Sequence, residues 1–390
     1  MGQIENIKQM RKARSRKRAA KKFFVLMFLS LIMIVSYLLW ETIKDFDIKT
    51  KVNDIFISMG SGPGFPVSIA GKEAMALYDV SGMPALINDS NNFLYNEKGK
   101  TVSNIQHGCR VPMADSAGGK IMIYDLGGRK LKIYSKSRML IEKNFDQNII
   151  NADMSESGDF AVALGSNDYV GQVFVHNDKG KSMFIWSSAE NVITDVALSP
   201  SGQYLAVTAV NSDNGKLVSF LYIFKIGDNK ISHKIEFSEE YPVEVCFKDN
   251  SIVTVLTDRT IRNYTTSGRE AGIYDFSGKI LCDFALDSRK NSILAFKKPG
   301  NRPIYMLVLL GEKNEIIWQK DMEEKVIDLG IDDKGVFITG EDKIVFYNLK
   351  GEETELISAP LVRKTLVMGQ KVYYSTHNEV YKTSAVRVLE

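Results

Sequence analysis

Five consecutive copies of a repeated strand pattern carry an acid or its amide at one equivalent position. That position lies three residues before the last apolar residue of a short strand, just ahead of a polar turn. The five residues are Asn151, Asp195, Glu244, Asp283 and Asp328. If this strand is the innermost of each copy, the side chains gather near one end of a shared channel. An acidic arc of this kind could bind a cation, a basic peptide or an amine-bearing glycan.

The same series has a structural interpretation. A carboxylate at a strand start or at a junction between repeats can accept backbone N–H hydrogen bonds, and it would recur because the repeat recurs. In two flanking repeats, Arg110 and Lys364 stand near the equivalent place. Five acids spread around a ring are too far apart to share one small ion, so we expect no metal site. The sequence leaves the binding role and the structural role open.

The other residues capable of chemistry form no recognised catalytic set. The four histidines, His107, His176, His233 and His377, show no metal-ligand spacing, and no G-x-S-x-G motif is present. In "IQHGCRVP", His107 and Cys109 could form a reactive pair, or the segment could be an ordered loop with an incidental cysteine. We therefore expect no cofactor and no catalytic residues.

Two alternating hairpins would position these side chains. One has apolar or aromatic strands around a polar turn that ends in glycine, as in "VFVHNDKGKSM" from Val173. The other is a short strand, a polar turn and a β-branched or aromatic strand, as in "ALSPSGQYLAVTAV" from Ala197. The glycines that can supply the positive φ of a bulged hairpin turn are Gly99, Gly180, Gly268 and Gly351.

Alternation of these hairpins predicts four strands per repeat. Eight repeats fill residues 66–390 at about 40 residues each, which is the period of a β-propeller blade. A lone four-stranded meander cannot bury both of its faces, whereas blades stacked around an axis bury both. We predict an all-β propeller of eight blades, with seven as the alternative. We also expect Pro66–Ala70 to pair with Val386–Glu390 and close the ring.

A basic and then apolar N-terminus precedes the repeats. Residues 1–22 contain nine Lys or Arg and one Glu, a net charge of +8, whereas the whole chain carries +3. The uncharged stretch Phe23–Trp40 would span roughly 27 Å as a helix, and "SYLLWETI" lacks the small residues of a signal-peptide cleavage site. The basic flank places the tail in the cytoplasm. The predicted order is a cytoplasmic tail (1–22), a transmembrane helix (23–40), a juxtamembrane linker (41–65) and an extracytoplasmic propeller (66–390).

Two segments carry a resemblance to known proteins. They are "GSGPGFPVSIAG" and "QHGCRVPMADSAGGKIMIYDLGGRKLKIY" (Gln106 to Tyr134). With the basic anchor, they resemble an uncharacterised Gram-positive bacterial family that carries only a domain-of-unknown-function label. The strand turns are similar to those of WD-like and quinoprotein-like propellers, although WD dipeptides are absent. The resemblance implies a membrane-anchored propeller and no catalytic residues. No Lys-Ser/Thr follows "GSGPGFP", so it is interpreted as the turn by which the chain enters the domain.

These features favour a non-enzymatic binding or scaffold module at the cell membrane. A propeller held outside by one helix would bind an envelope protein, a peptide or a wall polymer, and we expect no nucleic-acid partner. The alternatives are a propeller hydrolase or lyase at the cell envelope, and a ligand sensor that signals to a membrane partner.

Overall fold

The computed structural model describes residues 26–36, 53, 54, 57, 60–69, 74–228, 230–286, 290–300 and 302–385. These residues belong to two compact parts of the chain, Met1–Asn53 and Asp54–Glu390. In the first part, residues 26–36 form a helix with exposed side chains. The remainder of the predicted span Phe23–Trp40, and the basic tail before it, lie outside the described residues. Within the described ranges, no helix is both long enough and apolar enough to cross a bilayer.

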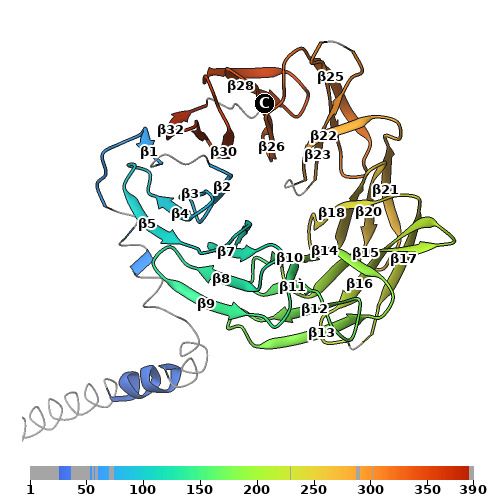
Figure 1. The fold of residues 1–390 in the computed structure, drawn as a ribbon. Helices are drawn as coiled ribbons and strands as arrows, with labels where there is room; N and C mark the ends of the chain where they lie inside the picture. Colours follow the sequence, from blue (N-terminus) through green and yellow to red (C-terminus); the bar gives the residue numbers. More distant parts are fainter. Residues whose placement is uncertain are drawn as a thin grey trace, which may run out of the picture. The chain divides into compact units, whose positions relative to one another are not determined.

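The second part consists of eight four-stranded antiparallel sheets around a central axis (Figure 1). This confirms the all-β propeller and decides for eight blades over seven. Blades 1 to 4 comprise β2 (Ala76–Asp79), β3 (Pro84–Ile87), β4 (Asn91–Tyr95), β5 (Thr101–Gln106); β6 (Pro112–Ala117), β7 (Lys120–Asp125), β8 (Lys130–Tyr134), β9 (Met139–Asn144); β10 (Ile149–Met154), β11 (Phe160–Leu164), β12 (Gly171–His176), β13 (Ser182–Ser188); and β14 (Val192–Leu198), β15 (Tyr204–Asp213), β16 (Lys216–Lys225), β17 (His233–Ser238).

Blades 5 to 8 follow the same pattern except in the last blade, which takes one strand from the start of the domain. They comprise β18 (Pro242–Phe247), β19 (Ile252–Thr257), β20 (Thr260–Thr265), β21 (Glu270–Asp275); β22 (Ile280–Ala285), β23 (Ser292–Lys297), β24 (Tyr305–Leu310), β25 (Ile316–Met322); β26 (Asp328–Asp332), β27 (Gly335–Thr339), β28 (Lys343–Asn348), β29 (Glu353–Ser358); and β30 (Lys364–Met368), β31 (Lys371–Ser375), β32 (Glu379–Ser384), β1 (Val67–Ser68).

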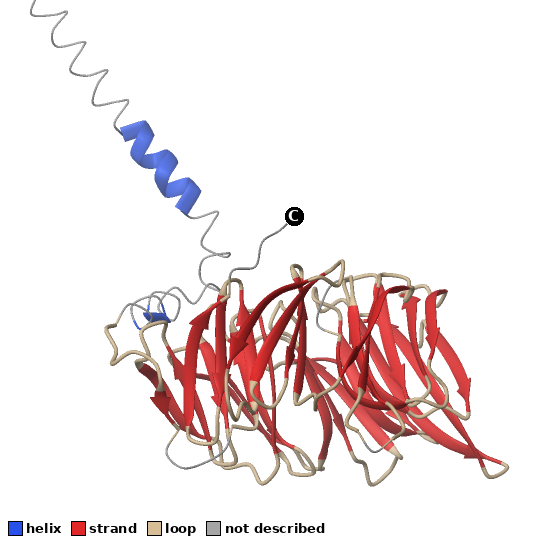
Figure 2. Cartoon of the chain, turned by 90° about the horizontal axis from the view of Figure 1, so that it is seen from above, coloured by secondary structure: helices blue, strands red, loops and turns tan. Residues whose placement is uncertain are grey.

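The strands run between two faces covered by loops and turns (Figure 2). Because successive strands are antiparallel, each innermost strand begins at the same face of the propeller. We call this the loop face; it carries the connections between blades and those between the second and third strands of each blade. The opposite, turn face carries the turns between the first and second strands and between the third and fourth strands.

Burial on both sides of each sheet holds the blades together. The second strand of each blade has a buried apolar centre, and in β11 every residue from Phe160 to Leu164 is buried. Eight buried apolar clusters occupy the eight junctions between neighbouring blades. At the junction of blades 3 and 4, for example, Ala161 and Val173 belong to the same cluster as Val207 and Phe224. This packing explains why the strands are enriched in β-branched and aromatic residues.

The glycine turns adopt the predicted bulged conformation. Gly99, Gly180, Gly268 and Gly351 have φ values of 73°, 77°, 78° and 83°. In each of these blades the register between the third and fourth strands shifts by one residue next to the turn. A side chain at these positions would be strained, because residues with a Cβ disfavour positive φ, whereas glycine does not.

Ring closure differs from the prediction in one of its two strands. The N-terminal strand β1 does close the ring, but it pairs with β32, where Val67 lies opposite Val380 and Ser68 opposite Glu379. The expected partner, Val386–Glu390, lies outside the described residues. Hydrogen bonding in blade 8 therefore joins the start of the domain to a strand more than 300 residues later, a pairing that no local pattern specifies.

The segment before β1 packs against the turn face as the chain enters the domain. The Gly64 N–H donates to the Lys98 carbonyl oxygen at 2.9 Å, and the Asn96 Nδ2 donates to the Gly60 carbonyl oxygen at 2.7 Å. A Cβ on Gly62 would lie 2.3 Å from the Lys98 oxygen. Glycine is thus required where the backbone of this segment, residues 60–66, touches the turn between β4 and β5. We call this segment the strap.

Candidate functional site

The five predicted site residues all lie on innermost strands of consecutive blades. Asn151 is on β10, Asp195 on β14, Glu244 on β18, Asp283 on β22 and Asp328 on β26. In all of these strands except β26, the register with the second strand shifts by one residue just before the acid or amide. A bulge of this kind changes the direction of the side chain that follows it.

Each carboxylate with described hydrogen bonds joins two neighbouring blades. The Val245 N–H from blade 5 donates to Asp195 Oδ2 in blade 4 at 2.7 Å, and the Thr365 N–H from blade 8 donates to Asp328 Oδ2 in blade 7 at 2.9 Å. Asp283 accepts from the backbone N–H of Leu329 in the same way. These contacts are what the structural interpretation of the series requires, because each acid serves the junction next to it.

Asp195 is the most highly connected member of the series. Its Oδ1 accepts the Val196 N–H at 2.8 Å and also a hydrogen bond from the Asn151 side-chain amide. Its side chain is 7% exposed, and burial raises the pKa of Asp195 to about 7. Three donors therefore converge on one buried carboxyl group. The amide at position 151 fits the series because its Nδ2 donates to the carboxyl group of the next blade.

The later members of the arc are more accessible and lie closer to a cation. Burial raises the pKa of Asp283 to about 6, and the neighbouring Asp328 adds to this shift. Burial also raises the pKa of Asp328, although Lys364 Nζ lies 2.9 Å from Asp328 Oδ1 and opposes the shift. Lys364 thus occupies the equivalent place in blade 8, whereas Arg110 lies before β6 and its backbone N–H binds Asp125. Glu244 is half-buried on β18.

A second carboxylate series escaped the sequence analysis. Asp115 Oδ2 accepts the Met154 N–H at 2.8 Å, and Asp153 Oδ2 accepts the Leu198 N–H at 2.6 Å, again from one blade to the next. The two acids are hydrogen-bonded to each other, and burial, with the charge of Asp115, raises the pKa of Asp153. The signal was an Asp one or two residues before the end of two innermost strands, too short a series to stand out.

The His107–Cys109 segment is an ordered loop. His107 Nε2 lies 3.1 Å from the Asn88 carbonyl oxygen, and the Cys109 N–H donates to His107 Nδ1 at 3.1 Å. Both ring nitrogens are therefore engaged by the backbone. Burial raises the pKa of the Cys109 thiol to about 11, so the reactive thiolate is not favoured near neutral pH. These contacts favour the loop-ordering interpretation over the reactive pair.

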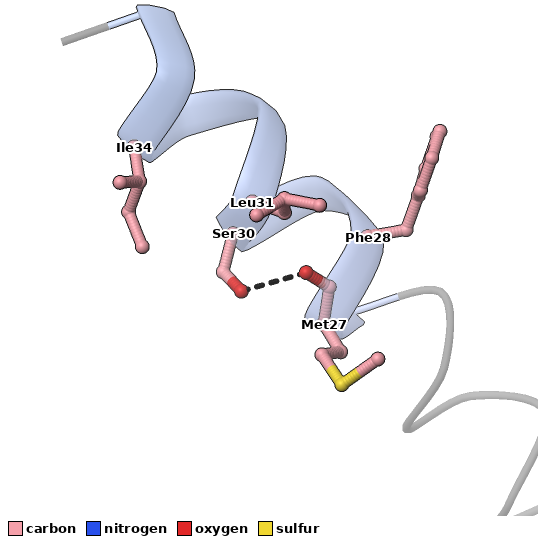
Figure 3. Close-up of a pocket in the computed structure, with 5 residues that line it drawn as sticks. All are labelled: Met27, Phe28, Ser30, Leu31 and Ile34. Atoms are coloured by element: carbon pink, nitrogen blue, oxygen red, sulfur yellow. Dashed lines mark hydrogen bonds between the residues drawn. The ribbon is translucent and has the colours of Figure 1, made fainter. Parts of the chain in front are cut away.

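Other site types receive no support within the described residues. Over those ranges no three His, Cys, Asp or Glu side chains are grouped so as to hold a metal ion. A hollow beside residues 26–36 is lined by Met27, Phe28, Ser30, Leu31 and Ile34 (Figure 3). All five come from a single helix, and no other described element lines the hollow, so it gives no support for a ligand site.

The loop face carries a concentration of exposed apolar side chains. Eleven large apolar residues with 38–73% exposure lie there: Met75, Val111, Met113, Leu126, Tyr169, Val170, Val192, Tyr241, Val243, Ile280 and Leu361. Eight of them stand at or just before the start of an innermost strand and so surround the channel mouth. The comparable residues described at the turn face are five and lie away from the channel: Ile231 in a turn, and Met139, Met183, Ile316 and Ile317 at the starts of outermost strands. We call the eleven residues the apolar rim.

One member of the rim has an unusual backbone. Leu361 is 73% exposed and has a φ of 61°, a left-handed conformation that is rare for a bulky residue. Its N–H donates to the Glu341 carbonyl oxygen at 3.1 Å, which holds the conformation in place. The strained backbone therefore presents a leucine side chain to solvent at the channel mouth.

Comparison with solved structures finds other propellers. The C-terminal WD40 domain of Sif2 superimposes with a TM-score of 0.59 at 12% identity, covering 82% of this chain and 98% of that chain. BamB from Moraxella catarrhalis has a TM-score of 0.52 at 8% identity, with the same coverage of 82% and 98%. A eukaryotic initiation factor has a TM-score of 0.54 at 13% identity, over 83% and 88% of the two chains. At these identities the likeness concerns the fold alone.

At the level of sequence, no curated protein matches the chain. A family model does match, and it covers residues 72–358, which include all five residues of the predicted acidic arc and most of the apolar rim. This agrees with the resemblance to an uncharacterised family that rested on the basic anchor, on "GSGPGFPVSIAG" and on the segment Gln106–Tyr134. The chain belongs to the family of unknown function DUF5711.

Proposed function

We propose that this propeller is a non-enzymatic binding module, held at the outer surface of a membrane by Phe23–Trp40, and that its loop face binds a polypeptide partner. The carrying observation is the apolar rim, eleven exposed apolar side chains on the loop face, eight of them around the channel mouth, whereas the five described at the turn face lie on outer strands or in an outer turn. Exposed apolar groups gathered on one side of a domain are typical of interaction sites.

The composition of the rim favours a polypeptide over a glycan. Nine of its eleven members are aliphatic residues or methionines, and only Tyr169 and Tyr241 offer aromatic rings. Sugars stack on aromatic faces, whereas aliphatic pockets suit apolar side chains of a protein or peptide. Asp283 and Asp328 lie partly buried on the innermost strands behind this rim, so a partner that combines apolar side chains with a basic residue would match both layers.

A photo-crosslinking experiment on the full chain in its native membrane tests this function. The photoreactive residue replaces Ile280 or Leu361 on the rim, and Ile185 or Leu356 on outer strands as matched controls of similar exposure. We expect one adduct of defined mass from the two rim positions only. It should disappear when Tyr241, Val243 and Ile280 are replaced by Ser in the Leu361 probe. Equal adducts from the outer strands, or none from the rim, would contradict the proposal.

One observation favours the enzymatic alternative enough to test it. Asp115 and Asp153 form a buried hydrogen-bonded pair, and perturbed carboxyl pairs also occur in hydrolases. Both acids, however, accept backbone N–H groups from the next blade, which is a structural use of the same atoms. If hydrolysis of an envelope polymer were found, and if it were lost in Asp153→Asn without a change in melting, the enzymatic function would replace the binding module.

A further inference from the structure

The turn face is chemically uneven, because its third-to-fourth-strand turns differ in charge around the ring. In blades 1 to 3 these turns carry six cationic residues: Lys98, Lys100, Lys136, Arg138, Lys179 and Lys181. The only acids in the same turns are Glu97 and Asp178. In blades 5 to 7 the corresponding turns balance Arg269, Lys313 and Lys350 against Glu312, Glu315 and Glu352. We call the six cations the basic turn patch.

One of the two acids in these turns, Glu97, forms an ion pair with a lysine of another blade. Lys371 from blade 8 pairs with the Glu97 carboxylate, and this contact lowers the pKa of Glu97. Lys382 Nζ donates to the Glu97 carbonyl oxygen at 2.9 Å, which brings a further cation to the same turn. The six cations of the patch therefore outnumber the two acids of the same turns.

The turns of the patch form a connected surface. A hollow of about 370 Å³ lies between blades 1 and 2 and is lined by Ser81, Gly82, Met83, Asn96, Glu97, Lys98 and Lys136. Lys136 Nζ donates to the Ser81 carbonyl oxygen at 2.9 Å and so joins the two blades. The third turn packs on blade 2, because a Cβ on Gly180 would contact Lys143 and Ile141. Because Lys98 and Lys136 line this hollow, it suits an anionic lipid headgroup.

The strap lies on these same turns. It binds the turn at Lys98 through Gly64, and Asp54 Oδ1 accepts a hydrogen bond from Ser135 Oγ at 3.5 Å in the next turn. Asp54, the first residue of the second part of the chain, therefore lies beside the patch. Residues 41–53 separate this point from Trp40, and thirteen residues can extend over at most about 45 Å.

We infer that the basic turn patch rests on the anionic phospholipid surface of the membrane to which the chain is tethered, an inference that rests on the proposed anchoring. Lysine and arginine side chains near a membrane are attracted by anionic headgroups within a Debye length. Since the described turns of the patch expose no large apolar side chain, the contact is electrostatic and is weakened by salt. Docked this way, the propeller turns its apolar rim away from the lipid and toward a partner.

The test uses the full chain in vesicles of phosphatidylcholine alone or with about a third phosphatidylglycerol. In a Cys282→Ser background, a fluorophore is attached through Ser182→Cys beside the patch or through Ser267→Cys in blade 5. A nitroxide on the lipid headgroup quenches any nearby fluorophore. We expect at least twofold more quenching at position 182 in anionic than in neutral vesicles, and a smaller change at position 267.

Two charge-reversal variants provide matched controls. Lys98→Glu, Arg138→Glu and Lys181→Glu together should remove the extra quenching, whereas Arg269→Glu, Lys313→Glu and Lys350→Glu should leave it intact. All six side chains are exposed and lie in equivalent turns of the two halves, so both triples change the net charge equally. Salt at about 0.5 M should abolish the extra quenching in the unaltered chain, which gives a readout independent of any variant. Equal quenching in both vesicles, or equal loss in both triples, overturns the inference.

Two further measurements distinguish this inference from the proposed function and from binding of a soluble polyanion. Flotation of the chain with neutral vesicles tests the anchor alone. If the chain floats but the quenching is the same with and without phosphatidylglycerol, the docking inference fails while the proposed anchoring stands. If it does not float with neutral vesicles yet binds anionic ones through the patch, anchoring fails while the patch stands. Binding of soluble polyphosphate through the six cations, without any lipid-dependent quenching, would assign the patch to a soluble polyanion and overturn the inference.

Discussion

The two faces of this propeller are made by one repeat and yet have opposite chemistry. The loop face exposes the eleven residues of the apolar rim, most of them around the channel mouth, whereas the described turn face exposes five comparable residues, none of them on an innermost strand. The turn face instead carries the basic turn patch on blades 1 to 3 and receives the strap. Between the faces, the innermost strands repeat the same carboxylate-to-backbone contact from blade to blade.

This contrast separates residues that serve the repeat from residues that serve a partner. Buried positions recur because every junction needs the same packing and the same hydrogen bonds. Exposed turns are free of that requirement, so a feature restricted to one face or to three of eight blades needs another cause. The acidic series has the contacts of the first kind, and we propose that the rim and the patch belong to the second.

The largest expected effect concerns the layer between the faces. Replacing Asp195 by Ala leaves the Val196 and Val245 N–H groups and the Asn151 amide without their acceptor, at any pH. We expect the free energy of unfolding to fall by about 4 kcal/mol, measured by denaturant titration. Crosslinking from the rim should persist at temperatures where the variant is folded. A loss of partner binding with unchanged stability would instead make Asp195 a ligand-binding residue.

The next effect is the pH dependence of the same group. A carboxyl group with a folded-state pKa of about 7 and an unfolded value near 4 binds more protons when folded, so its stabilising contribution falls as pH rises through that window. From pH 5 to pH 8 the unaltered chain should lose roughly 3 kcal/mol relative to Asp195→Asn, which cannot titrate. Parallel stability profiles for the two proteins would show that Asp195 is not protonated in the fold.

A smaller effect tests how the strap is attached to the turn face. Gly62→Ala places a Cβ against the Lys98 carbonyl oxygen and should release the strap. Because its two hydrogen bonds are lost, we expect the free energy of unfolding to fall by about 2 kcal/mol. The Gly64 amide should then exchange its hydrogen at least tenfold faster. Ser61→Ala, one residue away and exposed, is the control and should leave this exchange unchanged. Unchanged exchange in Gly62→Ala would show that the contact tolerates a side chain.

The smallest effect concerns the strained leucine of the rim. Asn tolerates the left-handed conformation better than Leu, so Leu361→Asn should raise the free energy of unfolding by about 0.5 kcal/mol. The same change should weaken the rim-dependent crosslink formed through Ile280. Leu356→Asn, on an exposed outer strand, should do neither. A stabilised variant with unaltered crosslinking would remove Leu361 from the binding surface.

Much of the blade architecture could be predicted because its signals are local. Polar turns between apolar strands, and glycines at the bulged positions, depend on residues that are neighbours in the chain. Hairpins such as "ALSPSGQYLAVTAV" therefore appear as β14 and β15, with the turn where the pattern places it. The predicted partner of β1 was wrong because strand pairing across the whole ring depends on the registers of all the blades together. The Asp115 and Asp153 contacts were missed because only two blades carry them.

The sequence by itself determined the repeat, the glycine turns and the position of the acidic series on the innermost strand of five consecutive blades, whereas the structure decided for eight blades over seven. Alternation and turn chemistry act over a few residues, so these features need no knowledge of distant contacts. Only the tertiary structure decided where the carboxylates point, because the bulge and the neighbouring blade's N–H groups set their partners. It also decided which exposed residues share a face, since the rim and the patch assemble from loops and turns that are separated in the chain and meet only in the closed ring.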